Sequence, residues 1–186
     1  MKKATMLAGV ICVIGCAGLS VAAAQTNPAP QQTTPADKAP LSKQDSDFFE
    51  DATQGGMLEV KLGELALKKA TNEDVKKYAQ RMIDDHTKLG NQLKQIAQTK
   101  KGVTVPNALE RKQMDEVEKL AKYNGADFDK HYMSKMVDAH KDDVKAFEKQ
   151  AKDGKDTDLK AAATGALPTL QDHLTQAKDI ESRLKK

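Results

Sequence analysis

The sequence predicts an all-α protein, a bundle of four long helices with one short helix. Three observations support this prediction. From about residue 42 onward, apolar residues recur at alternating steps of three and four, which is the spacing of one helix face. No segment alternates with the period of two that a half-buried strand requires. Only 4% of the 186 residues are aromatic, and Ala, Leu, Lys, Glu, Asp and Gln are abundant, which is typical of helices rather than of β-sandwiches or barrels.

The first two helices are expected to form a tight hairpin. The first spans about residues 45–70 and carries Gly56 and Gly63 on its apolar stripe. Because glycine lowers helix propensity, we expect a neighbouring helix to approach closely at these two positions. The motif Thr71-Asn72-Glu73-Asp74 resembles a capping box, so the second helix starts at once, and it ends before Pro106.

Three further helices are expected to follow. A short third helix is predicted over residues 107–123. The fourth is capped by Asp127 and ends at Asp153-Gly154, and the fifth begins near Asp156 and extends to the C-terminus. Pro168 lies inside the fifth helix, where it removes a main-chain hydrogen bond, so we expect a kink near this residue.

The first 24 residues have the pattern of a secretory signal peptide. Lys2 and Lys3 precede an apolar stretch of small residues, and Ala22-Ala23-Ala24 gives a motif for signal peptidase. Two alternatives stay open: a retained membrane anchor, and lipidation of Cys16, which ends a sequence that resembles a bacterial lipobox. Cleavage after residue 24 removes both cysteines of the chain, which excludes disulfides, thiolate metal ligands and cysteine nucleophiles.

Residues 25–44 form a predicted tether ahead of a bundle domain at residues 45–186. The tether is rich in Pro, Gln and Thr and has almost no large apolar residue, so it cannot bury enough surface to fold. It is either a disordered leader or a spacer that holds the domain off a membrane or the cell wall. The expected location is the periplasm or the outer membrane and cell envelope. A net charge of +3 without Arg-rich stretches argues against nucleic acid as a partner.

An internal repeat relates the second and fourth helices. Both share a Tyr-x3-Met-x3-His spacing, which places the three side chains on one helix face because residues four apart lie one turn apart. Repetition of helices is how pseudo-symmetric bundles such as the ferritin-like folds are built. The matched positions, at one constant separation of 54 residues, are Tyr78, Met82, Asp84, His86, Leu93 and Ala97 with Tyr132, Met136, Asp138, His140, Phe147 and Ala151.

Three of the four histidines are expected to point into the core. His173 lies on the apolar stripe of the fifth helix, whereas His131 lies at the edge of its stripe and is expected to be exposed. Imidazole with thioether sulfur suits copper(I), and imidazole with a carboxylate suits iron, manganese or zinc. The alternative is a satisfied core, in which buried histidines bond to Tyr, Thr or main-chain groups and methionines fill gaps. The candidate metal ligands are His86, His140, His173, Met82, Met136 and Glu59.

Catalytic motifs are missing from the sequence. The chain after residue 24 has no cysteine, no Gly-rich phosphate loop and no nucleophile elbow. The Glu-x-x-His pairs that di-iron bundles use are also absent, because Ile83, Val137 and Leu170 stand three residues before the inward histidines. We therefore assign no catalytic residue and expect the chain not to act as an enzyme.

An ordered set of motifs resembles the bacterial "domain of unknown function 4142" family over residues 46–184. Members of this family are exported, are described as outer-membrane or periplasmic proteins, and are grouped with the ferritin-like superfamily. The resemblance implies a ferritin-like up-down helical bundle and an envelope location, and it transfers no reaction. The motifs are Phe48-Phe49, Gln54–Val60, Leu62–Ala66, Met82–His86, Phe128-Asp129 with Tyr132, His140, and Leu167–Leu174.

The expected function is that of an exported cell-envelope bundle, a non-enzymatic binding or stress-related module. The first alternative is a periplasmic metal-binding protein that uses the core histidines and methionines for copper, iron or zinc. The second alternative, ranked lowest, is a di-metal redox enzyme. Association with the envelope or a membrane is expected through the tether, or through a lipid anchor at Cys16.

Overall fold

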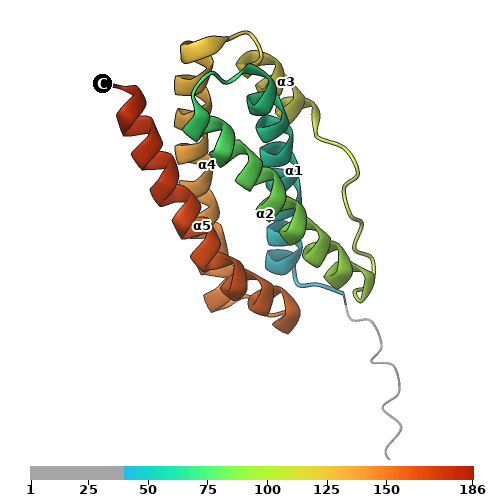
Figure 1. Cartoon of the computed structure of the whole chain (residues 1–186). Coiled ribbons are helices and arrows are strands. Elements are labelled where there is room, and N and C mark those ends of the chain that lie inside the picture. The colour runs from blue at the N-terminus through green and yellow to red at the C-terminus, as the bar shows by residue number, and fades with distance from the viewer. Residues whose placement is uncertain (1–39) are drawn as a thin grey trace, which may run out of the picture. The chain divides into compact units, whose positions relative to one another are not determined.

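The computed structural model describes residues 40–186 and contains five helices and no strand within them (Figure 1). This confirms the all-α prediction. The predicted signal peptide and most of the predicted tether lie outside the described residues. None of the helices within residues 40–186 is both long and apolar enough to cross a membrane. The helices are α1 (Lys43–Lys69), α2 (Glu73–Gln98), α3 (Arg111–Leu120), α4 (Gly125–Asp153) and α5 (Thr157–Leu184).

The four long helices form two antiparallel hairpins, α1–α2 and α4–α5, joined by a crossover that contains α3. The crossover returns the chain along the bundle, so α4 starts at the same end as α2 (Figure 1). Asp129, near the start of α4, accepts hydrogen bonds from the main-chain N–H groups of Thr71 (3.1 Å) and Asn72 (2.9 Å) in the α1–α2 turn. Accordingly α1 packs on α4 and α2 packs on α5. One long crossover of this kind is typical of ferritin-like bundles.

A second buried carboxylate joins the hairpins at the opposite end. Asp45, near the start of α1, accepts hydrogen bonds from the main-chain N–H groups of Lys155 (3.0 Å) and Asp156 (3.1 Å) in the α4–α5 turn. The side chain of Gln150 donates a third, at 2.7 Å. Burial acts to raise the pKa of Asp45, but these bonds and one from Ser42 hold it below its usual value.

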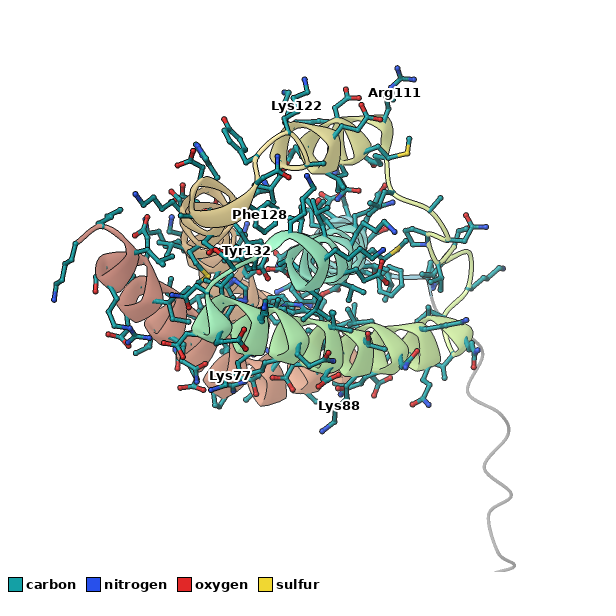
Figure 2. The ribbon with its side chains drawn as sticks, turned by 45° about the horizontal axis from the view of Figure 1, so that its top comes forward. Lys77, Lys88, Arg111, Lys122, Phe128 and Tyr132 are labelled. Carbon is teal, nitrogen blue, oxygen red and sulfur yellow. The ribbon has the colours of Figure 1, made fainter. Side chains whose placement is uncertain are left out.

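The interior consists of two apolar clusters separated by one polar layer. On each long helix, a buried polar residue (Glu59, His86, His140 or His173) stands between residues of one cluster and residues of the other. Basic side chains extend outward, as Figure 2 shows for Lys77, Lys88, Arg111 and Lys122, whereas Phe128 and Tyr132 point between the helices. One cluster includes Leu62, Val75, Met82, Phe128, Tyr132, Met136 and Ile180, and the other includes Phe48, Phe49, Leu93, Phe147, Leu159 and Leu170.

The close approach expected at the glycines of α1 is confirmed at Gly63. A Cβ atom there would lie 2.9 Å from the carbonyl oxygen of Ala79 and 2.9 Å from Cγ1 of Ile83, both on α2. At Gly56, a Cβ atom would lie 3.7 Å from Nδ1 of His86, which is ordinary contact. Glycine is therefore required sterically at the first position and fits closely beside the polar layer at the second.

Two predicted helix starts were wrong. Helix α3 begins at Arg111 rather than at residue 107, because the main-chain N–H of Glu110 is satisfied by the side chain of Gln113 at 3.1 Å, so the cap lies at Glu110. Helix α4 begins at Gly125 rather than after a cap at Asp127, because the main-chain N–H of Phe128 bonds to the carbonyl of Asn124 at 3.3 Å, which makes Asn124 the N-cap. Gly125 has a positive φ of 57°, which glycine tolerates easily.

The remaining predictions about helix α5 have different outcomes. Its cap is confirmed, since the side chain of Asp156 accepts hydrogen bonds from the N–H groups of Asp158 and Leu159. The helix is continuous from Thr157 to Leu184 with Pro168 in its interior, and the kink near this residue stays a prediction.

Candidate metal centre

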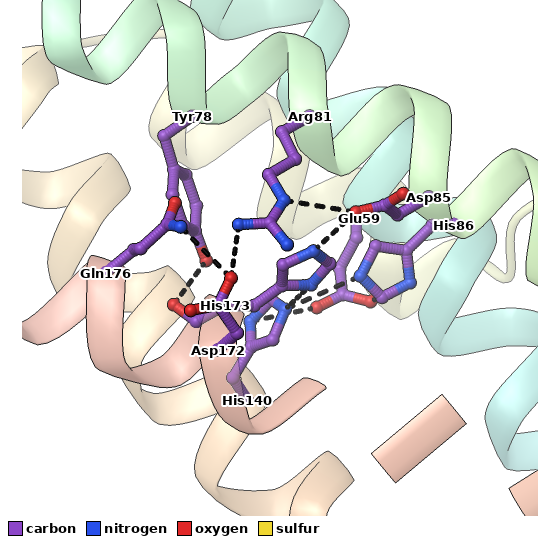
Figure 3. A network of polar contacts seen from close by, with 9 residues as sticks. All are labelled: Glu59, Tyr78, Arg81, Asp85, His86, His140, Asp172, His173 and Gln176. Carbon is purple, nitrogen blue, oxygen red and sulfur yellow. Dashed lines mark hydrogen bonds and ion pairs between the residues drawn. The ribbon is translucent and has the colours of Figure 1, made fainter. Parts of the chain in front are cut away.

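Three histidines from three different helices meet in the polar layer (Figure 3). His86 comes from α2, His140 from α4 and His173 from α5, and their exposed fractions are 4%, 0% and 0%. Glu59 reaches the same layer from α1 and is 3% exposed. The sequence prediction that these three histidines face the core is confirmed. His131, expected outside, is exposed and stacks on Tyr123 with ring centroids 3.7 Å apart.

His140 stands at the centre of the three imidazoles. Its Nε2 lies 3.4 Å from Nε2 of His86 and 3.2 Å from Nδ1 of His173. One ring nitrogen from each histidine lies within 4.8 Å of the others. Three imidazole nitrogens bound to one ion at a metal–nitrogen distance of about 2.0–2.1 Å would be about 3.4 Å apart. The spacing of these nitrogens thus suits a single transition-metal ion between them.

The outer nitrogen of each histidine has an oxygen acceptor. Nδ1 of His140 lies 3.0 Å from the main-chain carbonyl of Met136. Nε2 of His173 lies 2.8 Å from Oδ2 of Asp85, and Nδ1 of His86 lies 3.0 Å from Oε2 of Glu59. A carbonyl oxygen can only accept, so in His140 the proton must reside on Nδ1. We assign the same pattern to the other two, with the proton on the nitrogen that faces a carboxylate.

This pattern leaves the three inner nitrogens without a proton. Burial lowers the pKa of His86, and it lowers those of His140 and His173 to about 4 against the restoring effects of Glu59 and Asp85. The three rings are consequently neutral at pH 7, and three nitrogen lone pairs face one another with no donor between them. Buried acceptors without a donor are costly, and a bound cation would offset that cost. Neutral imidazole is also the form that ligates metals.

Asp85 holds His173 in place from the outside of the layer. Its Oδ2 atom also accepts a hydrogen bond from Nε of Arg81 at 3.2 Å, and Nη1 of Arg81 bonds to Asp172 at 2.5 Å (Figure 3). Burial acts to raise the pKa of Asp85, but the bonds from His173 and Arg81 keep it below its usual value. Asp85 is therefore a fixed carboxylate, and such partners orient a ligating histidine and raise its basicity.

Glu59 faces a second carboxyl group, that of Asp143 on α4. One oxygen of each, together with a ring nitrogen of His140, forms a group within 4.8 Å. Burial raises the pKa of Glu59, and it raises the pKa of Asp143 well above its usual value, with the negative charge of Glu59 as the next cause. Glu59 thus lies beside the outer nitrogens of two histidines, with Oε2 at 3.0 Å from Nδ1 of His86 and Oε1 at 3.4 Å from Nδ1 of His140, and it approaches Asp143 as well.

The two candidate methionines lie in the apolar cluster next to the polar layer. Met82 and Met136 are fully buried among residues such as Leu62 and Tyr132. Met136 contributes its main-chain carbonyl to His140. Their role as sulfur ligands stays a prediction. Tyr78, also in this cluster, donates its hydroxyl to the main-chain carbonyl of His173 at 3.4 Å.

Two surface pockets reach the histidines. One, of about 200 Å³ between α2 and α5, is lined by Asp85, His86, Gly165 and His173 among others. A larger one, of about 510 Å³ between α1, α2 and the crossover, also reaches His86. An ion therefore has a short path from the surface to two of the three imidazoles.

Asp85 and Asp143 are the two residues of this layer that the sequence analysis missed. Asp143 stands three residues after His140, on the same helix face, so the spacing His-x-x-Asp could have revealed it. Asp85 immediately precedes His86 and serves a histidine of another helix, so no spacing within α2 predicts its role. Only the packing of α2 on α5 brings the two side chains together.

Similar structures share this architecture at low sequence identity. The crystal structure of a DUF305 fragment from Deinococcus radiodurans has a TM-score of 0.67 and 13% identity, covering 77% of this chain and 99% of that chain. CopM in the Cu(II)-bound form has a TM-score of 0.64 and 19% identity, covering 75% and 96%. CopM in the Cu(I)-bound form has a TM-score of 0.63 and 20% identity, with the same coverage. These likenesses show the fold.

Sequence comparison identifies the family. The sequence profile of the Domain of unknown function (DUF4142) family matches residues 30–180. No match is found among the curated proteins. The chain belongs to the DUF4142 family, as the ordered motifs of its helices had indicated.

Proposed function

We propose that this member of the DUF4142 family binds one copper ion through Nε2 of His86, Nε2 of His140 and Nδ1 of His173. The observation that carries the proposal is the convergence of three ring nitrogens, 3.2–3.4 Å from one to the next, with an oxygen beside each outer nitrogen. In a core whose histidines are hydrogen-bonded without a metal, one of two adjacent ring nitrogens would carry a proton and donate it to the other. The protein would thus act as a metal-binding module without catalysis.

Copper is favoured over other ions by the donor set. Imidazole suits copper, zinc, iron and nickel, and the affinity order of divalent ions peaks at copper. The carboxylate of Glu59 is directed to the outer nitrogens of His86 and His140, which leaves three neutral nitrogen donors for the ion. Zinc usually takes a fourth ligand, whereas copper(I) accepts three donors. CopM, whose fold is similar, is described in Cu(I)- and Cu(II)-bound forms.

An exported location fits this proposal. The basic and apolar residues at the N-terminus and the Ala22-Ala23-Ala24 motif support secretion to the periplasm or the outer envelope. The bundle contains no cysteine, so the proposed copper site consists of imidazole groups. Such a site suits an oxidising compartment, where thiols form disulfides. Palmitate labelling with and without Cys16→Ala tests the alternative of a lipid anchor.

The proposal is tested by copper binding to the metal-free protein and to two histidine variants. We expect one Cu(I) per chain, measured by competition with a chromophoric chelator, and a higher melting temperature on binding. His140→Leu replaces the central ligand by a side chain of similar volume and should abolish tight binding while circular dichroism shows an intact bundle. His131→Leu, on the same helix but exposed, is the matched control and should bind like the wild type.

The alternatives are separated by the same measurements. Binding of zinc or iron in preference to copper would retain the site and correct its metal. Failure of the wild-type protein to bind any of the three, with no rise in melting temperature, would refute the metal-binding function.

A further inference from the structure

We propose that Glu59 and Asp143 form a second cation site beside the three histidines, suited to a hard divalent ion such as Mn²⁺. This site uses carboxylate oxygens from α1 and α4, and none of the three inner histidine nitrogens. The protein would then hold two ions of different chemistry in one polar layer.

The first support is a pair of carboxylate oxygens without donors. Among the described residues, Oε1 of Glu59 and Oδ2 of Asp143 are buried and have no N–H or hydroxyl donor, although the two carboxyl groups lie within hydrogen-bonding reach of each other. Oε1 of Glu59 lies 3.4 Å from Nδ1 of His140, but that nitrogen directs its proton to the carbonyl of Met136. Oε2 of Glu59 is already engaged by His86. Each carboxyl group therefore presents an oxygen that no donor from the rest of the described protein satisfies, and Glu59 is almost fully buried.

The second support is the proximity of the two groups. Their oxygens belong to one set of potential ligand atoms within 4.8 Å. Glu59 is buried and Asp143 is half-buried, and two carboxylates held side by side in this way repel each other. In a protein such a pair is stabilised by a cation or by a shared proton. Carboxylate oxygens and water are the ligands that Mn²⁺ and Mg²⁺ prefer. The pair thus differs from the adjacent imidazoles in the class of ion it selects.

The third support is a cleft that leads from the surface to Asp143. It lies between α1 and α4, has a volume of about 580 Å³, and is lined by Asp47, Asp51, Asp142 and Asp143, and also by Lys43 and Lys149, so its lining keeps an excess of negative charge. A concentration of negative charge raises the local concentration of cations. Water in the cleft can complete the coordination that two carboxylates leave open, as it does for most magnesium and manganese sites.

The test uses protein preloaded with one equivalent of Ag(I), which fills the histidine site and is magnetically silent. Mn²⁺ is then titrated and its free concentration is followed by electron paramagnetic resonance. We expect one Mn²⁺ per chain. Asp143→Asn should weaken Mn²⁺ binding at least tenfold and leave Ag(I) binding unchanged. Asp138→Asn, an exposed residue on the same helix that pairs with Lys141 and lies outside this cleft, is the matched control and should change Mn²⁺ affinity less than twofold.

A second variant separates this site from the proposed copper site. His173→Leu should lose Ag(I) or Cu(I) binding and keep Mn²⁺ binding, because His173 does not contact the carboxyl pair. Ag(I) binding without Mn²⁺ binding in the wild type would overturn the second site and leave the copper proposal standing. A proton shared by the two carboxyl groups would then be what stabilises the pair.

Equal weakening of Mn²⁺ binding by Asp142→Asn and Asp143→Asn would also overturn the second site, because the ion would then be held at the mouth of the cleft. Mn²⁺ binding without Ag(I) or Cu(I) binding would support the second site and count against the copper proposal.

Discussion

The two ends of the bundle and its middle bury polar groups in opposite ways. At the ends, the carboxylates of Asp45 and Asp129 accept several hydrogen bonds each from the N–H groups of neighbouring turns. In the middle, the inner nitrogens of the histidines face one another, and Oε1 of Glu59 has no donor. Both regions are equally buried, so burial does not distinguish them.

The difference between these regions separates structural from binding roles. A buried acceptor with a full set of donors stabilises the fold, because its desolvation is compensated within the chain. A buried set of acceptors without donors destabilises the empty fold, and a cation restores the balance. Changes at the ends should therefore have the same effect on stability with and without metal, whereas changes in the middle should also alter how much a bound metal stabilises the protein.

The largest expected effect is the pH dependence of the metal-free protein. Burial lowers the pKa of His140 and His173 to about 4, so between about pH 6.5 and pH 4 the unfolded chain binds more protons than the folded chain. The two histidines should therefore contribute stability that is full above this window and is lost through it as the pH falls, by on the order of 5 kcal/mol together. The raised pKa values of Glu59 and Asp143 act in the opposite direction, because their contribution is lost as the pH rises. Urea unfolding at several pH values measures this.

His140→Leu sharpens the pH prediction. The variant lacks one of the two titrating rings, so its stability should decrease less steeply between pH 6.5 and pH 4. A slope equal to that of the wild type would contradict the assignment of neutral, buried imidazole to His140.

The next effect concerns the ends of the bundle. Asp129→Ala leaves the N–H groups of Thr71 and Asn72 without their acceptor. Thr71 is exposed and Asn72 is half-buried, so water replaces part of what a fully buried donor would lose, about 1–3 kcal/mol each. We expect a loss of about 1–3 kcal/mol in the free energy of unfolding, measured by urea denaturation. The loss should be the same with and without copper, and a loss confined to the copper-bound form would contradict the structural role of Asp129.

The smallest effect concerns the support of His173. Asp85→Asn keeps an oxygen acceptor for Nε2 of His173 and removes its negative charge, so copper affinity should fall about tenfold with little change in the stability of the metal-free protein. Chelator competition measures the affinity. Asp84→Asn is the matched control, because Asp84 is exposed and bonds to Gln80, and its affinity should match that of the wild type. Equal effects of both variants would indicate a general electrostatic influence.

Local sequence signals predicted the helices well and their ends less well. The hairpin of α1 and α2 and the cap at Asp156 follow from periodicity and capping residues. The starts of α3 and α4 differ from prediction because several polar residues near each start can cap a helix, and tertiary packing selects among them.

The sequence by itself determined which histidines lie inside, because the face of a helix is a local property of residue spacing. His86, His140 and His173 stand on apolar stripes, and His131 does not. The tertiary structure alone decided which atoms meet. The tautomers, the support of His173 by Asp85 and the pairing of Glu59 with Asp143 depend on the relative height and rotation of separate helices. Those quantities are set by packing between distant segments, which no spacing along one helix encodes.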